Sequence, residues 1–209
     1  MTDALPFSPA AERNKQPILD VLRLVLPTQG LALEIAAGTG QHATWFAAGL
    51  PGWTWQPTEF DTDALPAIAA RAAAARAAEP AGGGLVCAPL RLDVMAPEWP
   101  FEAAVFDAIY CANMLHISPW ATCAALMNGA ARHLSTDGVL ITYGPYLEDG
   151  VPTSPGNLAF DASLRGQNAD WGIRRREDVE QVARRAGLRL RERHAMPANN
   201  LLLVWAREP

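Results

Sequence analysis

LALEIAAGTGQH, residues 31–42, is the stretch that decides the fold. Its apolar beginning is typical of a strand buried in a parallel sheet. An acid, Glu34, follows near the end of that strand, then a Gly-x-Gly turn at residues 38–40, and residues 41–50 have the composition of a helix. Glycines let the backbone approach a ligand closely, because they carry no Cβ and accept positive φ. The stretch therefore predicts a strand, a turn and a helix, with a ligand at the turn.

The acid before the glycines decides which ligand is expected. Residues 38–43, GTGQHA, also fit the dinucleotide fingerprint G-x-G-x-x-G/A. A dinucleotide carries an anionic pyrophosphate, which the carboxylate of Glu34 would repel. A ligand with sulfonium and ammonium groups would be attracted, and Glu34 is placed to bind an amino group or a ribose hydroxyl. A tight strand-to-helix turn with a solvated Glu34 is the structural alternative.

Length and composition limit the class of protein. The chain has 209 residues, of which 50% are hydrophobic, which predicts one domain over residues 1–209. No apolar run reaches the roughly 20 residues of a membrane span, and residues 1–9 lack the features of a signal peptide. The three cysteines show no C-x-x-C spacing, so we expect reduced thiols, no metal site and a cytoplasmic protein. A net charge of −5 argues against nucleic acid as a partner.

Strand and helix patterns alternate along most of the chain. After the first strand we expect strands at residues 53–60, 90–94, 105–113 and 138–143. Helices are expected at residues 14–26, 41–50, 63–79, 118–134 and 177–186, with Pro17 in the first turn of one and Ser118 as the N-cap of another. Strands at 188–196 and 201–207 form a hairpin at the end of the sequence. The order predicts an α/β fold with a doubly wound, mostly parallel seven-stranded sheet that finishes in an antiparallel hairpin.

One segment breaks the alternation. Residues 144–176 are rich in proline, glycine, asparagine and aromatic residues, and the segment is too long for an ordinary connection. We expect it to form a lid-like insertion over the ligand edge of the sheet.

Several further motifs stand at strand ends. Glu59 ends the second predicted strand, where a carboxylate can accept both hydroxyls of a ribose, while Asp61 and Asp63 are candidates for helix capping. Asp107 begins the fourth strand, at the end away from the ligand, so we interpret it as structural. His116 follows that strand at the ligand edge, where a ring with a pKa near neutrality can act as a general base, although packed or solvated histidines in turns are common.

These motifs together resemble one family. The glycine motif at 34–42 resembles the first motif of class I S-adenosylmethionine-dependent methyltransferases, which are Rossmann-like enzymes. The ordered set is similar to a methyltransferase-like domain-of-unknown-function family found in bacteria and animals. That set comprises RNK at 13–15, WQP at 55–57, NMLH at 113–116, SPW at 118–120, YGPY at 143–146, residues 157–165, WGIR at 171–174 and MPANN at 196–200.

The resemblance implies S-adenosylmethionine as the cofactor and assigns residues to it. The implied cofactor residues are Glu34, Gly38, Thr39, Gly40, Glu59, Asp93, Val94 and Asn113. In the family pattern Asp93 accepts from the adenine amino group with Val94 stacking nearby, and Leu65, six residues after Glu59, favours Glu59 over Asp61 as the ribose acid. The position of Asn113 faces the sulfonium and the methyl acceptor in many members.

Other residues are candidates for catalysis and for the methyl acceptor. We assign His116 and Tyr143 as catalytic candidates. The candidate substrate residues are Tyr146, Asn157, Phe160, Asp161, Arg165, Trp171, Asn199 and Asn200. Arg165 is a candidate clamp for an anionic substrate group or, equally, the partner of Asp161 in a structural ion pair, and the two asparagines also suit a hairpin turn.

Three functions are compatible with these patterns. The first is methyl transfer to a small-molecule acceptor, which needs alignment more than acid–base machinery. The second is a non-catalytic module that binds the cofactor or a partner. The third, a nicotinamide oxidoreductase, is disfavoured because a short-chain enzyme needs Tyr-x-x-x-Lys and Lys15 is the sole lysine. The sequence does not specify the acceptor atom or the oligomeric state.

Overall fold

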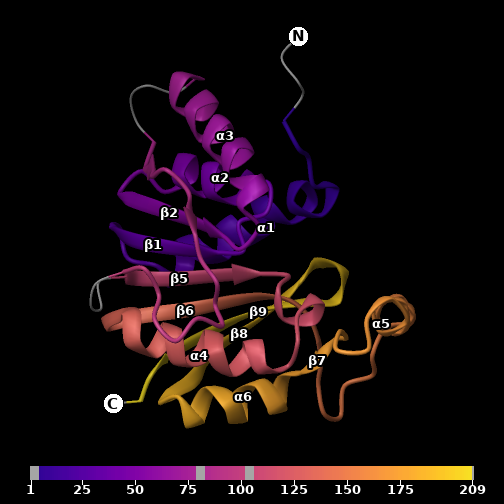
Figure 1. The fold of residues 1–209 in the computed structure, drawn as a ribbon. Helices are drawn as coiled ribbons and strands as arrows, with labels where there is room; N and C mark the ends of the chain where they lie inside the picture. Colours follow the sequence, from indigo (N-terminus) through magenta and orange to yellow (C-terminus); the bar gives the residue numbers. More distant parts are fainter. Residues whose placement is uncertain (1–4, 79–82, 102–105, 209) are drawn as a thin grey trace. The chain divides into compact units, whose positions relative to one another are not determined.

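The computed structural model describes residues 5–78, 83–101 and 106–208 (Figure 1). The chain divides into two compact units. The first unit comprises Met1–Asp93 and Phe106–Tyr110, and the second comprises Val94–Val105 and Cys111–Pro209. Strand β5 (Phe106–Ala112) therefore begins in the first unit and ends in the second.

The first unit is built on parallel strands. Strand β1 (Gly30–Ile35) pairs in parallel with β2 (Trp53–Glu59), from Gly30 opposite Trp53 to Glu34 opposite Pro57. The other edge of β2 carries two short parallel strands, β3 (Leu85–Val86) and β4 (Leu90–Arg91). The strand order in this unit is β3-β2-β1-β5. Parallel pairing brings the carboxyl ends of β1 and β2 to one edge of the sheet, next to the glycine turn.

Three helices accompany these strands (Figure 1). They are α1 (Pro9–Val25), α2 (Gln41–Gly49) and α3 (Leu65–Ala78), the last preceded by a 3₁₀ turn, η1 (Thr62–Ala64). Helix α1 packs on α2 through Leu19, and a Cβ on Gly49 would lie 2.4 Å from the Leu19 Cδ2 atom, so a larger residue at position 49 would force the Leu19 side chain to move. The core includes Phe46, Trp53 and Trp55, all fully buried.

Two expectations for the first unit are wrong. Helix α1 begins at Pro9 instead of residue 14, because Ser8 caps it by accepting a hydrogen bond from the N–H of Ala11, and Pro17 lies inside the helix. The third predicted strand, 90–94, begins where expected but is shorter, because β4 covers only Leu90–Arg91. A further short strand, β3, precedes it, and Pro89, which lies between the two strands, has no N–H for the ladder. Residues 79–82, part of the predicted break after α3, lie outside the described residues.

The second unit ends in an antiparallel hairpin. Strand β6 (Leu134–Leu147) pairs antiparallel with β9 (Asn200–Arg207), which pairs antiparallel with β8 (Leu188–Met196). A 3₁₀ turn, η3 (Pro197–Asn199), joins the hairpin strands, and the two-residue β7 (Arg174–Arg175) pairs in parallel with β6. The fold class predicted from the sequence, an α/β sheet of mostly parallel strands with a C-terminal antiparallel hairpin, is confirmed.

The helices of the second unit follow the prediction less closely. They are η2 (Leu115–Ile117), α4 (Ala121–His133), α5 (Pro155–Gln167) and α6 (Arg176–Arg185), and α4 and α6 lie side by side (Figure 1). Ser118 is not the N-cap of α4, because its hydroxyl donates to the carbonyl of Met114. The segment 144–176 contains the end of β6, all of α5 and β7. Within the described residues, no helix has both the length and the apolar character needed to cross a membrane.

Asp107 ties two strands of the first unit together. Its carboxylate accepts a hydrogen bond of 2.9 Å from the N–H of Leu31, which supports the structural role expected for it. We predict that Asp107→Ala lowers the free energy of unfolding by about 1–3 kcal/mol, because the amide loses its acceptor. Urea unfolding measures this change. The control is Asp137→Ala, at an exposed position, expected within about 0.5 kcal/mol of the native chain. Equal losses in the two variants would contradict the role of Asp107.

Candidate functional site

A buried acid stands at the end of β1. Glu34 is 2% exposed, and its Oε2 atom has no hydrogen-bond partner within the described part of the chain. Burial, together with the charge of Glu59, raises the pKa of Glu34 to about 8. A carboxylic acid in this environment costs stability, and such positions are common at functional sites.

The glycine turn lies directly after this acid. Gly38 and Gly40 have φ of 57° and 72°, and a Cβ on Gly38 would meet nothing within 4 Å, so open space borders the turn there. Gly40 is the N-cap residue of α2 and offers no side chain to the first amides of the helix. The turn therefore presents backbone and a positive helix end to open space. Ala36 also has a positive φ, 56°, which is costly for a residue with a Cβ.

Glu59 connects β2 to this turn. One carboxylate oxygen of Glu59 accepts a hydrogen bond of 2.7 Å from the N–H of Gly38, and the other accepts one of 2.7 Å from Phe60. A carboxylate offers about four acceptor positions, so Glu59 keeps capacity for a ligand. The neighbouring Asp61 caps η1 by accepting from the N–H of Asp63, as expected of a capping acid.

The first unit therefore brings together most of the predicted cofactor residues. Glu34, Gly38, Thr39, Gly40 and Glu59 lie on β1, on the turn and on β2, and Asp93 follows β4 in the same unit. Val94 and Asn113 belong to the second unit. The arrangement offers two carboxyl groups, exposed backbone and a helix N-terminus beside one another, which suits a ligand that carries hydroxyl groups and a positive charge.

A second cluster lies at the end of β5. Asn113 has φ of 57°, and its N–H donates to the carbonyl of Tyr143 at 2.8 Å. A Cβ on Gly144 would lie 3.5 Å from both the Asn113 Oδ1 and the His116 Nδ1. The hydroxyl of Tyr143 accepts a hydrogen bond of 3.1 Å from Asn200 on β9. The two catalytic candidates, His116 and Tyr143, thus lie in one region of the second unit, and Asn113 joins that region through its hydrogen bond to the Tyr143 carbonyl.

His116 is enclosed by the segment expected to form a lid. The ring of Phe160 on α5 stacks edge-to-face on the His116 ring, with centroids 5.6 Å apart, and the N–H of Gly172 donates to the His116 carbonyl at 2.9 Å. Burial, with a smaller contribution from the Arg174 charge, lowers the pKa of His116 to about 4. The ring is therefore neutral at pH 7.

Arg174 is a residue that the sequence analysis missed. Its guanidinium donates to the carbonyls of Leu115 and Ser118, at 3.0 and 2.6 Å, and lies 5.5 Å from the centre of the Trp120 ring. It thereby fastens β7 to η2, the turn that carries His116. The motif WGIR at 171–174 was the available signal, but it did not indicate which carbonyls the arginine binds.

Two predicted substrate residues are engaged with each other. Arg165 forms an ion pair of 2.8 Å with Asp161, the structural alternative considered above, and Asp161 also accepts from the N–H of Ile173 at 2.7 Å. The Arg165 guanidinium also lies against Gly172, where a Cβ would be 2.6 Å from Nη2. Contact of Asp161, Arg165 and Trp171 with a substrate stays a prediction.

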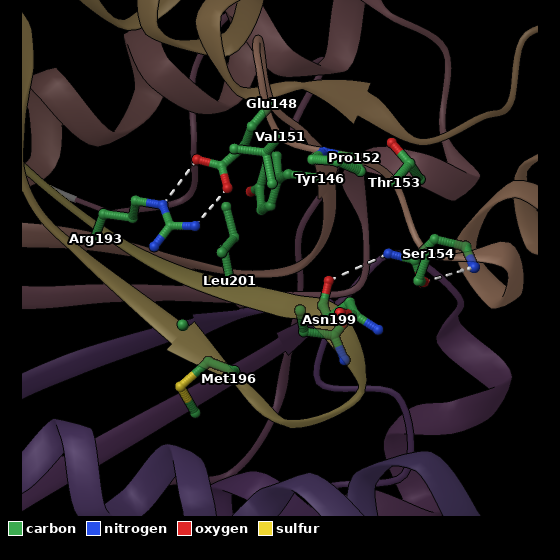
Figure 2. A pocket seen from close by; sticks show the side chains of 13 residues that line it. Tyr146, Glu148, Val151, Pro152, Thr153, Ser154, Arg193, Met196, Asn199 and Leu201 are labelled. Atoms are coloured by element: carbon green, nitrogen blue, oxygen red, sulfur yellow. Dashed lines mark hydrogen bonds and ion pairs between the residues drawn. The ribbon is translucent and has the colours of Figure 1, made fainter.

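Four other predicted substrate residues line one pocket, which we call the hairpin pocket (Figure 2). Its volume is about 150 Å³, and its predicted members are Tyr146, Asn157, Asn199 and Asn200. The hydroxyl of Tyr146 donates to Thr142 at 2.9 Å inside the protein, and burial raises its pKa, so a ligand would meet its ring. Sequence reasoning missed Glu148, Arg193 and Met196, which also line the pocket. Glu148 follows β6, while Arg193 and Met196 lie on β8, more than 40 residues later, so no local spacing links them.

The described residues contain no candidate metal site. No group of three or more histidine, cysteine, aspartate or glutamate side chains there is arranged to hold a metal ion. The cysteines in those ranges are free thiols, with Cys111 and Cys123 buried.

Comparison with known proteins identifies a family and a fold. A family model described as "Protein of unknown function (DUF938)" matches residues 5–207. Among solved structures, the mitomycin 7-O-methyltransferase MmcR is similar with a TM-score of 0.76 at 13% identity, over 95% of this chain and 55% of that chain. CalO1, a methyltransferase in calicheamicin biosynthesis solved in its SAH-bound form, has a TM-score of 0.71 at 14% identity, over 95% and 55%.

A third structure is similar to the same extent. An O-methyltransferase family protein from Burkholderia thailandensis has a TM-score of 0.74 at 20% identity, over 95% of this chain and 57% of that chain. The chain thus spans a little over half the length of these three proteins, 55–57%. At such identities the likeness establishes the fold, which is that of class I methyltransferases.

The raised pKa of Glu34 predicts a specific pH dependence of stability. Between pH 4.5 and about 8 the folded chain keeps a proton on Glu34 that the unfolded chain has lost, so this contribution to stability falls as pH rises. We predict that Glu34→Gln abolishes this fall and is more stable than the native chain at pH 8 by ~4 kcal/mol. Urea unfolding at pH 5, 6.5 and 8 provides the comparison, with Glu98→Gln, at an exposed position, as the control. Parallel pH profiles for Glu34→Gln and the native chain would refute the prediction.

The burial of His116 leads to a prediction about the pH at which its ring titrates. We expect the His116 ring to titrate with a midpoint at about pH 4 in the native chain. Removing its aromatic cover in Phe160→Ala should raise the midpoint toward the ordinary value near 6.5, because water then reaches the ring. NMR of the ring carbons against pH measures both values. A native midpoint near 6.5 would be inconsistent with the buried ring.

Proposed function

Because the chain belongs to the family described as "Protein of unknown function (DUF938)" and has a methyltransferase fold, we propose that it transfers a methyl group from S-adenosylmethionine to a small-molecule acceptor. The glycine motif, the two acids beside it and the cluster around His116 support this proposal. The names of the structural neighbours, which include O-methyltransferases, are consistent with it.

The observation that carries the proposal is the buried Glu34 carboxyl beside Glu59. The Glu34 Oε2 atom lacks a hydrogen-bond partner in the part of the chain that the structure describes. The charge of Glu59 at the glycine turn would repel an anionic pyrophosphate, and burial together with that charge raises the pKa of Glu34 to about 8. A ligand with a positive charge would stabilise the ionised form of Glu34 and give its free Oε2 atom a partner. S-adenosylmethionine carries both a sulfonium and an ammonium group.

The remaining residues of the turn fit the same ligand. Open space at Gly38 admits a ligand that lies against the backbone. Glu59, held by the amides of Gly38 and Phe60, would accept the ribose hydroxyls with its remaining lone pairs. Glu59 is thus proposed both to shape the turn and to bind the adenosyl group, while Asp61 serves only the local cap.

The cofactor, held by Glu34, Glu59 and the glycine turn, would supply an electrophilic methyl group to the acceptor's lone pair and would leave as the neutral sulfide. An O–H or N–H acceptor would then have a proton to lose. His116 and Tyr143 are the proposed catalytic residues of this chain. The neutral imidazole of His116 has a lone pair that can accept a hydrogen bond from the acceptor, but burial, which lowers its pKa to about 4, makes it a weaker base than the near-neutral ring expected from the sequence. Amine acceptors need no such base, and positioning alone then provides most of the rate.

Calorimetry tests the cofactor assignment. We predict that the chain binds S-adenosylmethionine and its demethylated product with micromolar affinity, about −8 kcal/mol. Glu59→Ala should lose about 1.5–3 kcal/mol of that affinity, because a charge-assisted hydrogen bond disappears. Asp61→Ala, the matched control, should lose little. Binding of NAD without either adenosyl ligand would refute the methyltransferase proposal, and equal losses in the two variants would refute the role of Glu59.

A further inference from the structure

The hairpin pocket has a defined size and an apolar floor. At about 150 Å³ it matches cavities that hold a single benzene ring. Its floor is formed by Tyr146, Met196 and Leu201, which are 7%, 8% and 5% exposed. The Tyr146 hydroxyl donates to Thr142, so this floor offers its ring face and aliphatic groups. A ligand that fits here has a compact apolar body of roughly six to ten non-hydrogen atoms.

The asparagines of the pocket supply hydrogen-bond acceptors. The Asn157 amide nitrogen donates to the carbonyl of Asn199 at 3.2 Å, and the Asn200 amide nitrogen donates to the carbonyl of Pro197 at 3.2 Å. Because a carbonyl can only accept a hydrogen bond, each bond shows which end of the asparagine amide carries the NH₂ group, and the other end is the oxygen. Within the described residues, the side-chain oxygens of Asn157 and Asn200 have no hydrogen-bond partner. They are the atoms left to meet a ligand that carries an O–H or N–H donor.

The charges around the pocket are already paired. Figure 2 shows Arg193 bound to Glu148 by two hydrogen bonds, of 2.8 and 2.5 Å. Glu148 also pairs with Arg176 at 3.0 Å, and the two arginines hold the pKa of Glu148 below its usual range. Arg176 is paired in turn with Glu177 and Glu180, at 2.7 and 2.9 Å, and Glu180 pairs with Arg184 at 2.6 Å. Three arginines thus balance three glutamates, so no excess charge favours an anion or a cation.

We propose that the hairpin pocket selects an uncharged acceptor of about one ring that carries an O–H or N–H group, such as a monocyclic phenol or an aromatic amine. The apolar floor holds the ring, and the oxygens of Asn157 and Asn200 accept from its donor group. The identity of this ligand as the methyl acceptor rests on the function proposed above. Its binding to the pocket does not require the cofactor.

Binding of matched probes to the full-length chain tests this class. The probes are phenol, aniline, toluene, benzoate and benzylammonium, which share one ring and differ in donor group and charge. Methyl NMR of methionine-labelled protein reports on the pocket directly, because Met196 lies in its floor, and Met196→Leu assigns the signal. We expect phenol and aniline to shift the Met196 signal and to bind at least about fivefold more tightly than toluene, the worth of one hydrogen bond. Benzoate and benzylammonium should bind more weakly than phenol.

Variants of the chain separate recognition from folding. Asn157→Leu and Asn200→Leu should each weaken phenol binding about fivefold, and Asn128→Leu, on an exposed position of α4, should leave it unchanged. Ala195→Trp places a large ring in the pocket from an exposed position on β8 and should abolish phenol binding. Because this position is exposed, the variant tests the pocket even if an asparagine variant fails to fold. Circular dichroism checks the fold of each variant.

The outcomes distinguish this proposal from the general function. Equal binding of toluene and phenol, preference for benzoate or benzylammonium, or an unshifted Met196 signal would each overturn the proposed ligand class, even if the chain binds S-adenosylmethionine. Phenol or aniline binding that Ala195→Trp abolishes, without methyl transfer to any probe, would support the pocket and count against the methyltransferase function.

Discussion

The constraint on which the candidate site in the first unit depends is the buried Glu34 carboxyl at the end of β1, whose Oε2 atom has no hydrogen-bond partner among the described residues. Glu34 is 2% exposed and lies close enough to Glu59 for one charge to disfavour the other. Glu59 in turn accepts hydrogen bonds from the N–H groups of Gly38, in the glycine turn, and of Phe60. The native fold tolerates the cost in stability of the buried Glu34 carboxyl, as enzymes tolerate strained or desolvated groups where a ligand will bind.

The second unit depends on a different kind of interaction, namely hydrogen bonds from side chains to backbone carbonyls and ion pairs between side chains. Arg174 donates to two carbonyls of the turn that carries His116, and the Asp161–Arg165 pair lies against Gly172. These bonds hold α5 and β7 against η2 and leave the His116 ring covered by Phe160. The segment 144–176 is thus integrated into the unit by hydrogen bonds and ion pairs, which allows a polar sequence to form defined structure.

The two units also differ in how they present charge. Around the glycine turn Glu34 and Glu59 are close and, within the described residues, form no ion pair, while Arg71 donates to the carbonyl of Thr39. The two acids therefore remain available to a positive ligand. Around the hairpin pocket each glutamate has an arginine, which favours a neutral one. Charge pairing therefore separates a region suited to a sulfonium compound from a region suited to an uncharged acceptor, although both contain several acidic residues.

The sequence by itself determined the α/β class, the parallel first strands, the terminal hairpin and the glycine turn with Glu34 and Glu59, because these features are written in contiguous, periodic or closely spaced residues. It failed at the start of α1, at the third strand and at Ser118. Both Pro9 and Pro17 suit the first turn of a helix, and the hydrogen bond to the Ser8 side chain fixes the start at Pro9. The hydroxyl of Ser118 suits a helix cap, but it donates to the carbonyl of Met114 instead. The tertiary structure alone decided that Tyr146, Asn157, Asn199 and Asn200 share a pocket with Glu148, Arg193 and Met196. Those residues come from β6, α5 and the hairpin, and no local pattern encodes the pairing of strands far apart in the chain.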